Sequence, residues 1–300
     1  MLESLISELL GGRLPRLVCD NEAAWKHIWL ERDIGSGRPT QVAVLGGALA
    51  DRLSWAFICG YQGAIRSVFP AVGSDGWASF LVTENRKQPR EFPAVTLSAE
   101  GRLNGVKTWV AAAANVEHLV VKAGQGTGRE FVLVNRHTEG VGIQVPKVSN
   151  FLSEMTQGSA HFDAVMVQPS HRLDAGEVET FGAREALFVQ MALVAQMANH
   201  AVHHAGDIHF VDRTITWLLA ADAATEFEPR GASFALSAAA LDREVTGLAT
   251  DFERSELPNA GDGIANWARD RRLISMYSAA IQRRAEEHGG TRASSKTRSG

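Results

Sequence analysis

Apolar residues follow two different spacings along this chain, and the changes between them divide the chain into three blocks. Residues 1–69 carry apolar side chains three and four positions apart, which is typical of helices that bury one face. Residues 77–173 alternate apolar and polar positions in short runs, as strands do. Helical spacing then returns. The C-terminal helices are expected near residues 182–205, 213–255 and 264–288.

The middle block predicts short strands separated by turn residues. Clusters of Gly, Asn, Pro and Ser lie between the apolar runs, which favours an antiparallel barrel or sandwich. Asn104-Gly105 is the dipeptide typical of a type I′ hairpin turn, so we expect a turn there. The expected strands are residues 78–83, 94–98, 105–110, 118–122, 130–135, 142–145 and 160–167.

The order of helices, then strands, then helices predicts an α+β protein with separate layers or domains. We expect an N-terminal helical domain at 1–76, a middle antiparallel β-barrel or sandwich domain at 77–174, and a C-terminal helical bundle at 175–290. Residues 291–300 are nearly devoid of apolar side chains and are expected to form a disordered tail. Pro229 should interrupt the second C-terminal helix.

Glycines lie inside the expected N-terminal helices. Gly46, Gly47, Gly60 and Gly63 each cost about 1 kcal/mol of helix propensity relative to alanine. In return they allow another helix to approach closely, so we expect close helix packing at these positions.

Composition and charge narrow the class of protein. The chain has 300 residues, of which 45% are hydrophobic and 21% charged, as in ordinary globular proteins. Thirty basic residues against 34 acidic ones give a net charge of −4, which disfavours a nucleic-acid partner. Cys19 and Cys59 both lie beside apolar residues, which predicts two reduced, buried thiols and a cytoplasmic protein.

Neither a signal peptide nor a membrane span is expected. The first apolar stretch contains acidic residues and lacks a preceding basic segment. The longest apolar stretch, residues 186–202, is interrupted by polar side chains such as Gln190 and Asn199, and it is too short to span a bilayer. We therefore expect a soluble cytoplasmic protein without a membrane partner.

Three motifs follow one another through the middle block. The stretch 103–110 reads Leu-Asn-Gly-Val-Lys-Thr-Trp-Val, and 80–84 upstream reads Phe-Leu-Val-Thr-Glu. Residues 162–167 read Phe-Asp-Ala-Val-Met-Val. In this order the three stretches resemble the middle domain of the acyl-CoA dehydrogenase family. The likeness extends over about residues 35–290, and the family's helix–β–helix order is the one that the spacing predicts.

The resemblance implies a flavin cofactor. In the family, the β domain and the C-terminal helices hold FAD, a glutamate removes the α-proton of an acyl thioester, and the β-hydrogen leaves as hydride. The implied FAD-binding positions are Phe80, Val82, Thr83, Trp109 and Ala111. Trp109 would pack against the flavin ring, although a strand tryptophan is also a common core residue. Ala111 stands where the family usually has a hydroxyl side chain, so that contact is missing.

The segment after Glu84 departs from the family. A Gly- and Ser-rich loop is replaced here by a basic one that contains Arg86, Lys87 and Arg90. Guanidinium and ammonium groups can meet phosphate charge directly, so these residues are candidates for contact with a substrate or cofactor phosphate. The alternative is a solvated surface loop.

The C-terminal block also matches in part. Residues 220–226 resemble the start of a bundle helix in the family, but the bundle is shorter than usual and lacks the motif that carries the family's catalytic glutamate. A minority of members place the base on the first C-terminal helix, and Glu185 falls near that position. Beside the apolar residues that follow it, this carboxylate would be desolvated. The alternative is a first-turn glutamate that interacts with the helix dipole and solvent.

The C-terminal block also contains a histidine cluster. His200 and His204 share one helix face, but no carboxylate lies at a ligand spacing from them. Ordinary helix-end histidines are the better interpretation, and no metal is expected. The sequence also lacks nucleophile-elbow, Walker and dinucleotide-binding motifs.

These patterns lead to three hypotheses. The first is an FAD-dependent oxidoreductase that dehydrogenates an acyl-CoA or related acyl thioester and passes electrons to electron-transfer flavoprotein or a similar acceptor. The second is a non-catalytic partner subunit of a full-length acyl-CoA dehydrogenase. The third is a flavin-dependent monooxygenase of the same fold. The apolar C-terminal helices imply a homo- or hetero-oligomer.

Overall fold

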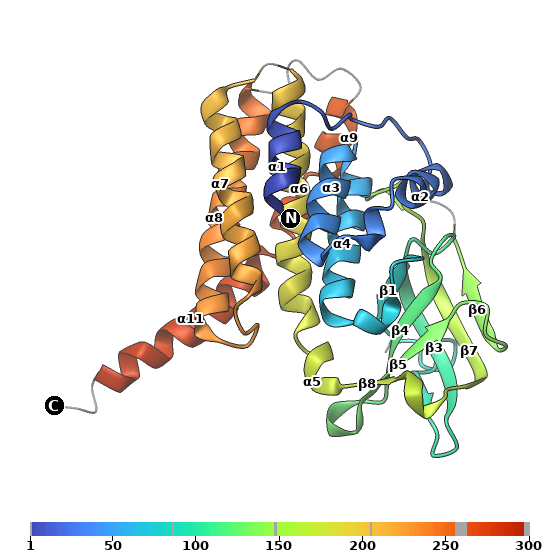
Figure 1. Ribbon diagram of the computed structural model, residues 1–300. Helices are drawn as coiled ribbons and strands as arrows, with labels where there is room; N and C mark the ends of the chain where they lie inside the picture. The colour runs from blue at the N-terminus through green and yellow to red at the C-terminus, as the bar shows by residue number, and fades with distance from the viewer. Residues whose placement is uncertain (1, 86, 147–148, 205, 256–262, 297–300) are drawn as a thin grey trace. The chain divides into compact units, whose positions relative to one another are not determined.

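The computed structural model describes residues 2–85, 87–146, 149–204, 206–255 and 263–296 (Figure 1). Helices occupy both ends of the chain, and the strands lie between them. The α-helices are α1 (Leu2–Leu10), α2 (Glu22–Glu31), α3 (Pro39–Leu49), α4 (Leu53–Val68), α5 (Ala175–Val178), α6 (Phe181–His203), α7 (Ile208–Thr225), α8 (Ala232–Ser255), α9 (Gly263–Asp270), α10 (Arg272–Ser275) and α11 (Ser278–Lys296).

Two four-stranded sheets form the middle of the chain. One has the order β1-β4-β5-β8 and the other β2-β3-β7-β6; the β1–β4 pair is parallel and the other pairs are antiparallel. The predicted α+β class with a β-sandwich is therefore confirmed. The strands are β1 (Ala78–Leu81), β2 (Thr96–Leu97), β3 (Arg102–Ala111), β4 (His118–Ala123), β5 (Glu130–Asn135), β6 (Val141–Gln144), β7 (Gln157–Met166) and β8 (Arg172–Leu173).

Local sequence signals account for several helix boundaries. Asn21 caps α2, because its side chain accepts a hydrogen bond from the Ala24 N–H at 2.9 Å. Asp207 caps α7 through the His209 N–H at 3.0 Å. Pro229 lies between α7 and α8, so the expected interruption of the helical segment 213–255 is confirmed.

The expected hairpin turn at Asn104-Gly105 is wrong, because both residues lie inside β3. The Asn104 side chain accepts a hydrogen bond from the Ala164 N–H on β7 at 2.8 Å. Ala164 has a positive φ of 49° and lies at a register shift between the two strands. Asn104 therefore stabilises a bulge in the neighbouring strand, a contact that the dipeptide itself does not reveal.

The chain end also differs from expectation. Helix α11 continues to Lys296, so it extends into the stretch 291–300 for which the sequence predicted disorder. Residues 297–300 lie outside the described residues.

The chain folds into two compact units. The helical unit comprises Met1–Val18, Gly37–Ala64 and Gly182–Gly300, and the mixed unit comprises Cys19–Ser36 and Ile65–Phe181. The expected three-domain division stays a prediction.

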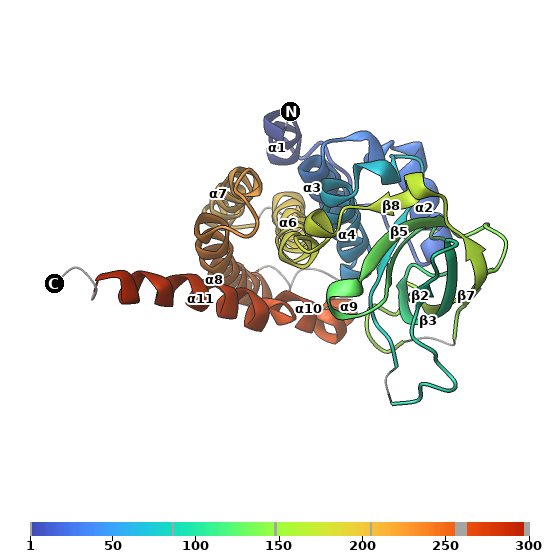
Figure 2. The same cartoon turned by 90° about the horizontal axis from the view of Figure 1, so that it is seen from below.

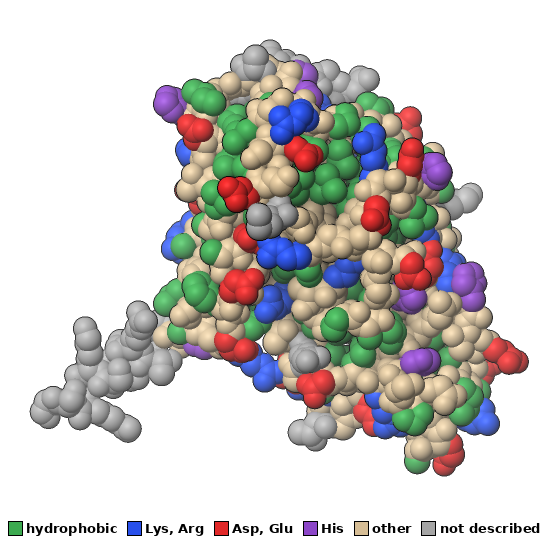
Figure 3. Space-filling view, viewed as in Figure 1, with side chains coloured by type: hydrophobic (Ala, Val, Ile, Leu, Met, Phe, Trp, Pro, Cys, Tyr) green, Lys and Arg blue, Asp and Glu red, His purple; other side chains and the backbone are tan. Residues whose placement is uncertain are grey.

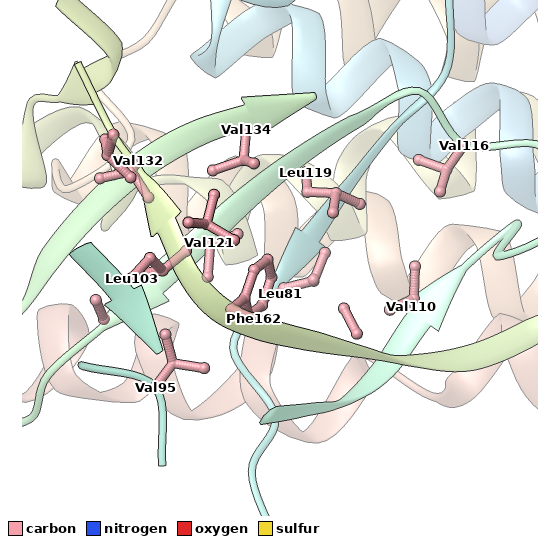
Figure 4. Packing of buried hydrophobic residues seen from close by; sticks show 14 of the residues in the cluster. Leu81, Val95, Leu103, Val110, Val116, Leu119, Val121, Val132, Val134 and Phe162 are labelled. Carbon is pink, nitrogen blue, oxygen red and sulfur yellow. The ribbon is translucent and has the colours of Figure 1, made fainter. Parts of the chain in front are cut away.

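The core of the mixed unit lies between its two sheets. Leu81 and Val121 come from one sheet, while Leu103 and Phe162 come from the other, and all four are at most 4% exposed (Figure 4). The alternating pattern places these side chains on the inner faces, because successive strand residues point to opposite sides of a sheet. This shared apolar layer holds the sandwich together.

Helix α6 is the centre of the helical unit. Both ribbon views show it between the α7–α8 pair and helices α3 and α4 (Figures 1 and 2). A Cβ atom at Gly60 on α4 would lie 2.5 Å from the Val189 Cα atom on α6, so glycine is what lets the two backbones approach. Gly63 on α4 similarly faces the Phe188 ring and the Pro39 carbonyl.

The polar side chains of α6 hydrogen-bond to neighbouring segments. Asn199 Nδ2 donates to the carbonyl oxygens of Ala48 at 2.7 Å and Leu14 at 3.1 Å. Gln196 Nε2 donates to the Ala50 carbonyl at 3.2 Å. These bonds satisfy the buried amide N–H groups and fix the position of α6 along its neighbours.

The structure shows the state of the two cysteines and the character of the described helices. Cys19 and Cys59 are both buried, and neither forms a disulfide. None of the described helices combines the length and the apolar composition that crossing a membrane requires. On the face shown in Figure 3, acidic and basic side chains are interspersed.

Gly60→Ala should destabilise the protein by about 1–3 kcal/mol. The added methyl group gains about 1 kcal/mol of helix propensity, but it meets the α6 backbone and forces the helices apart. Urea denaturation followed by circular dichroism measures the difference. Gly128→Ala is the matched control, because its Cβ atom would have no neighbour within 4 Å. Equal stability of the two variants would contradict this account of the α4–α6 contact.

Candidate active site

The motif residues of the mixed unit meet where β1 ends beside β3. The ladder between β1 and β4 ends at Leu81↔Val121, so Val82 and Thr83 extend beyond it with exposed side chains. The Thr83 carbonyl accepts a hydrogen bond from the Thr108 N–H at 3.0 Å. Two stretches that the sequence separates by about 25 residues are thereby joined into one edge.

Trp109 lies in a β-bulge of β3 at this edge. Between the pairs Lys107↔Ala160 and Val110↔Gly158, β3 contains one residue more than β7. Such bulges change the direction of a side chain and are frequent beside active sites. The Trp109 ring is half-buried, so part of its surface remains available to a ligand.

Gln157 orients the Trp109 ring. The indole Nε1–H donates to Gln157 Oε1 at 3.3 Å, and Gln157 Nε2 donates to the Phe151 carbonyl at 2.8 Å. No local feature of the sequence indicates that Gln157 contacts a tryptophan 48 positions away, so this residue was not predicted.

Two other expected cofactor positions are packed within the mixed unit. Ala111 is buried, and its N–H donates to Ser79 Oγ at 3.0 Å. The Phe80 ring packs against the rings of Phe181 and Phe69, at centroid distances of 4.6 and 5.7 Å. Val82, Thr83 and Trp109 therefore form the accessible part of the predicted flavin-binding set.

Glu84 and Lys107, which belong to the recognised motifs, form a buried ion pair. Lys107 Nζ lies 2.5 Å from Glu84 Oε1, and the Lys107 side chain has no exposed surface. Glu84 Oε1 also accepts from the Val95 N–H at 3.3 Å. Both motif residues thus have a structural role next to the edge.

The basic loop lies on the surface. Lys87 and Arg90 are exposed, and the turn is closed by Asn85, whose side chain accepts from the Lys87 N–H and donates to Gln88. Arg86 lies outside the described residues. The phosphate-binding role of this loop stays a prediction.

A buried carboxylate that the sequence analysis missed lies in the same unit. Glu22 on α2 accepts hydrogen bonds from the Thr156 N–H at 2.5 Å, from Thr156 Oγ1 and from Asn115 Nδ2 at 2.8 Å. Burial raises the pKa of Glu22, while these donors lower it. The bonds fix the start of β7, where Gln157 follows Thr156.

In the helical unit, Glu185 lies in the second turn of α6. Tyr277 Oη, from the segment between α10 and α11, donates to Glu185 Oε1 at 2.9 Å. The side chain keeps some exposed surface, but the surrounding protein removes most of its hydration, and this burial raises the pKa of Glu185 to about 7. The Tyr277 bond acts in the opposite direction and lowers that pKa.

This environment bears on the two interpretations of Glu185. A solvated first-turn glutamate would keep its carboxylate hydrated, whereas this carboxyl is desolvated and bonded to a phenol. A carboxyl with a pKa near 7 can accept a proton at neutral pH and release it again, as a general base must. The environment is therefore the one that a catalytic base needs.

Arg213 has partners within its own unit. It lies 2.7 Å from Glu244 and 2.6 Å from Asp251, both on α8. A cavity of about 370 Å³ between α7 and α8 is lined by Arg213 together with Trp217 and other residues of these helices. Arg213 therefore bridges two helices of the bundle.

The histidines lie at the C-terminal end of α6. His200 is buried, with its ring 4.3 Å from the His204 ring and 5.1 Å from the Phe252 ring. Among the residues that the structure describes, no three His, Cys, Asp or Glu side chains converge as metal ligands do.

Lys107→Met should destabilise the protein by about 3–5 kcal/mol, because it leaves the Glu84 carboxylate buried without its cation. Chemical denaturation of purified protein measures the loss. Arg172→Met, which breaks the exposed Arg172–Glu130 pair, is the control and should cost less than about 1 kcal/mol. The double variant Glu84→Gln/Lys107→Met should recover part of the loss. If Lys107→Met and Arg172→Met lower the stability equally, the buried pair is contradicted.

Glu185→Gln should become more stable relative to the wild type as the pH rises from 5 to 8. The native carboxyl holds its proton up to about pH 7, whereas the unfolded chain releases it near pH 4.5, so wild-type stability falls across this window. Because the side chain is partly hydrated, we expect a change on the order of 2 kcal/mol. Denaturation of both proteins at pH 5 and pH 8 measures it. Glu31→Gln, which removes an exposed carboxylate, is the control.

Comparison with known proteins supports the fold. No family model and no curated protein matches the sequence. A solved structure of PigA with FAD and proline aligns with a TM-score of 0.68 at 13% identity, over 97% of this chain and 96% of its own. FkbI, from biosynthesis of the methoxymalonyl extender unit of the Fk520 polyketide, aligns with a TM-score of 0.63 at 18% identity, over 96% and 99%.

A third structure, dibenzothiophene monooxygenase (TdsC) from Paenibacillus sp. A11-2, aligns with a TM-score of 0.62 at 14% identity, over 95% of this chain and 93% of its own. At these identities the similarity is one of fold. The chain has the acyl-CoA dehydrogenase-like fold, as the motifs of the middle block predicted.

Proposed function

We propose that this protein is an FAD-dependent oxidoreductase that dehydrogenates an acyl thioester between its α- and β-carbons, with Glu185 as the base. The observation that carries the proposal is the Glu185 carboxyl, which is desolvated, has a pKa of about 7 and is held by Tyr277. The fold and the order of the middle-block motifs support a flavin enzyme.

The accessible edge of the mixed unit fits a flavin. It offers an aromatic face at Trp109 and exposed residues at Val82 and Thr83, which suit a flat heterocycle with a polar rim. These three residues would hold the ring system, and Gln157 would keep Trp109 in place. When bound, FAD would supply the chemistry of accepting a hydride from the substrate β-carbon.

Glu185 would take the α-proton of the substrate. The thioester carbonyl acidifies this C–H bond, and the transferred proton becomes part of the neutral carboxylic acid. Burial favours that neutral form, so the environment that raises the pKa of Glu185 also favours proton transfer to it. General bases of this kind contribute about 10²–10⁴-fold to a rate.

The remaining partners belong to the same proposal. Lys87 and Arg90 are exposed and could bind the phosphates of a coenzyme A thioester. Electrons would leave to electron-transfer flavoprotein or a similar acceptor. A homo- or hetero-oligomer is proposed from the apolar bundle helices and not from any observed interface.

A flavin-dependent monooxygenase is the second candidate. It is favoured by the fold similarity to dibenzothiophene monooxygenase over most of both chains. Such an enzyme needs no glutamate base, so Glu185 distinguishes the two candidates.

The test begins with FAD binding and continues with anaerobic reduction by a panel of acyl-CoA thioesters. Wild-type protein should bind FAD and lose its flavin absorbance near 450 nm, roughly the wavelength at which oxidised flavins absorb, when its substrate is added. Glu185→Gln should bind FAD equally well and reduce it about 10²–10⁴-fold more slowly.

Glu31→Gln is the matched control, because it removes an exposed carboxylate. Failure of the wild-type protein to bind FAD would overturn the proposal, and so would undiminished reduction by Glu185→Gln. Flavin-dependent oxygenation that survives Glu185→Gln would establish the second candidate. Reduction seen only in complex with an intact dehydrogenase would indicate a partner subunit instead.

A further inference from the structure

We propose that Tyr277 is the positioning residue of the Glu185 carboxylate, and that a cluster centred on Asp242 holds Tyr277 in place. This inference rests on the proposed role of Glu185 as a base. It concerns residues of the helical unit only and assigns functions to side chains that no motif indicated.

Tyr277 acts on one oxygen of the carboxylate. Its phenol donates to Glu185 Oε1 at 2.9 Å, so the rotation of the carboxylate about its last bond is restricted. We therefore assign Oε2 as the oxygen that takes the substrate proton. Fixing a base in one orientation contributes to rate because less freedom is lost in the transition state.

The Asp242 cluster connects the helix that carries Glu185 with the segment that carries Tyr277. Asp242 on α8 is buried, and its Oδ1 accepts hydrogen bonds from Gln190 Nε2 and Ser278 Oγ, each at 2.8 Å. Its Oδ2 accepts from Gln282 Nε2 at 2.9 Å.

The positions of these donors along the chain explain their effect. Gln190 lies on α6, five residues after Glu185, and Ser278 directly follows Tyr277 at the start of α11. One buried carboxylate thereby fixes the helix that carries the base and the segment that carries its phenol. A buried carboxyl group requires such hydrogen-bond partners, because an unsatisfied polar group would be strongly destabilising.

The polar surroundings explain why a phenol suits this position. A neutral donor orients the carboxylate and leaves it basic. A guanidinium at the same distance would lower the carboxylate pKa by roughly 1–3. Tyr277 is the titratable group that acts on the pKa of Glu185, and Tyr61 on α4 in turn acts on Tyr277.

Arg184 on α6 and Arg284 on α11 are not among the groups that shift the pKa of Glu185. Arg184 donates to the Thr225 carbonyl at 3.0 Å, and the Arg284 guanidinium lies near Gly182. Tyr277 itself stays protonated, because burial and the neighbouring carboxylate both raise its pKa.

The chain offers a selective probe of this contact, because Tyr61 and Tyr277 are its only two tyrosines. Protein labelled with ¹³C-tyrosine should show one tyrosine signal that shifts with a midpoint near pH 7, as Glu185 ionises. The shift should persist in Tyr61→Phe and disappear in Glu185→Gln. This measurement needs neither cofactor nor activity.

The kinetic test uses Tyr277→Phe in the FAD-loaded enzyme. Loss of the phenol should move the acid limb of the kcat/KM profile to higher pH, since the bond lowers the pKa of Glu185. It should also reduce kcat by roughly three- to tenfold, the amount expected for one hydrogen bond, with little change in KM. Ser278→Ala, which cuts one tie of the Asp242 cluster, should move both quantities in the same direction by less.

The outcomes separate the two proposals. A tyrosine signal that titrates near pH 7 in an enzyme whose Glu185→Gln variant keeps full activity supports the contact and overturns the base. A wild type without such a signal, or a signal unchanged in Glu185→Gln, overturns the positioning role. So does a Tyr277→Phe profile with an unmoved acid limb. Should Tyr277→Phe fail to fold, the labelled wild type and Glu185→Gln still decide the matter.

Discussion

The close packing of α6 against its neighbours is the constraint on which the helical unit depends. Its middle is buried on every side, and glycines on α4 let the backbones come into direct contact. Buried amides at Gln196 and Asn199 add directional bonds that prevent the helix from sliding. Dense packing of this kind tolerates few alternative arrangements. A carboxylate placed near the start of α6 therefore has a fixed origin, and only its side chain needs further positioning.

In the mixed unit, polar contacts fix the position of the candidate site residues. Its apolar layer forms the sandwich, while polar contacts shape the edge that carries Trp109. A bulge in β3 turns the indole, Gln157 binds it, and the buried Glu22 carboxylate fixes the neighbouring Thr156. The Glu84–Lys107 pair is buried next to this edge. Such pairs contribute little net stability, but each partner needs the other, so the pair specifies one local arrangement.

Part of this picture was accessible from the sequence because it depends on local periodicity and on ordered motifs. Seven of the strands of the middle block, the interruption at Pro229 and the fold class were predicted, since alternation and helical spacing report which face of an element is buried, whereas the short β8 was not predicted. The hairpin turn predicted at Asn104-Gly105 was wrong, because the turn preference of this dipeptide is weaker than the pairing of β3 with β7 and the hydrogen bond from Ala164. The helix through residues 291–296 was missed, because its composition contains few apolar residues.

The periodicity and the ordered motifs predicted most of the elements and pointed to the candidate residues Glu185 and Trp109. Only the tertiary structure decided what surrounds them: Tyr277 is 92 positions from Glu185, Gln157 is 48 from Trp109, and Glu22 is 134 from Thr156. Contacts at such separations leave no periodic trace in a single sequence. The properties that make a carboxyl a base, namely desolvation and a neutral donor, arise from those contacts, because a pKa depends on the groups that packing brings together.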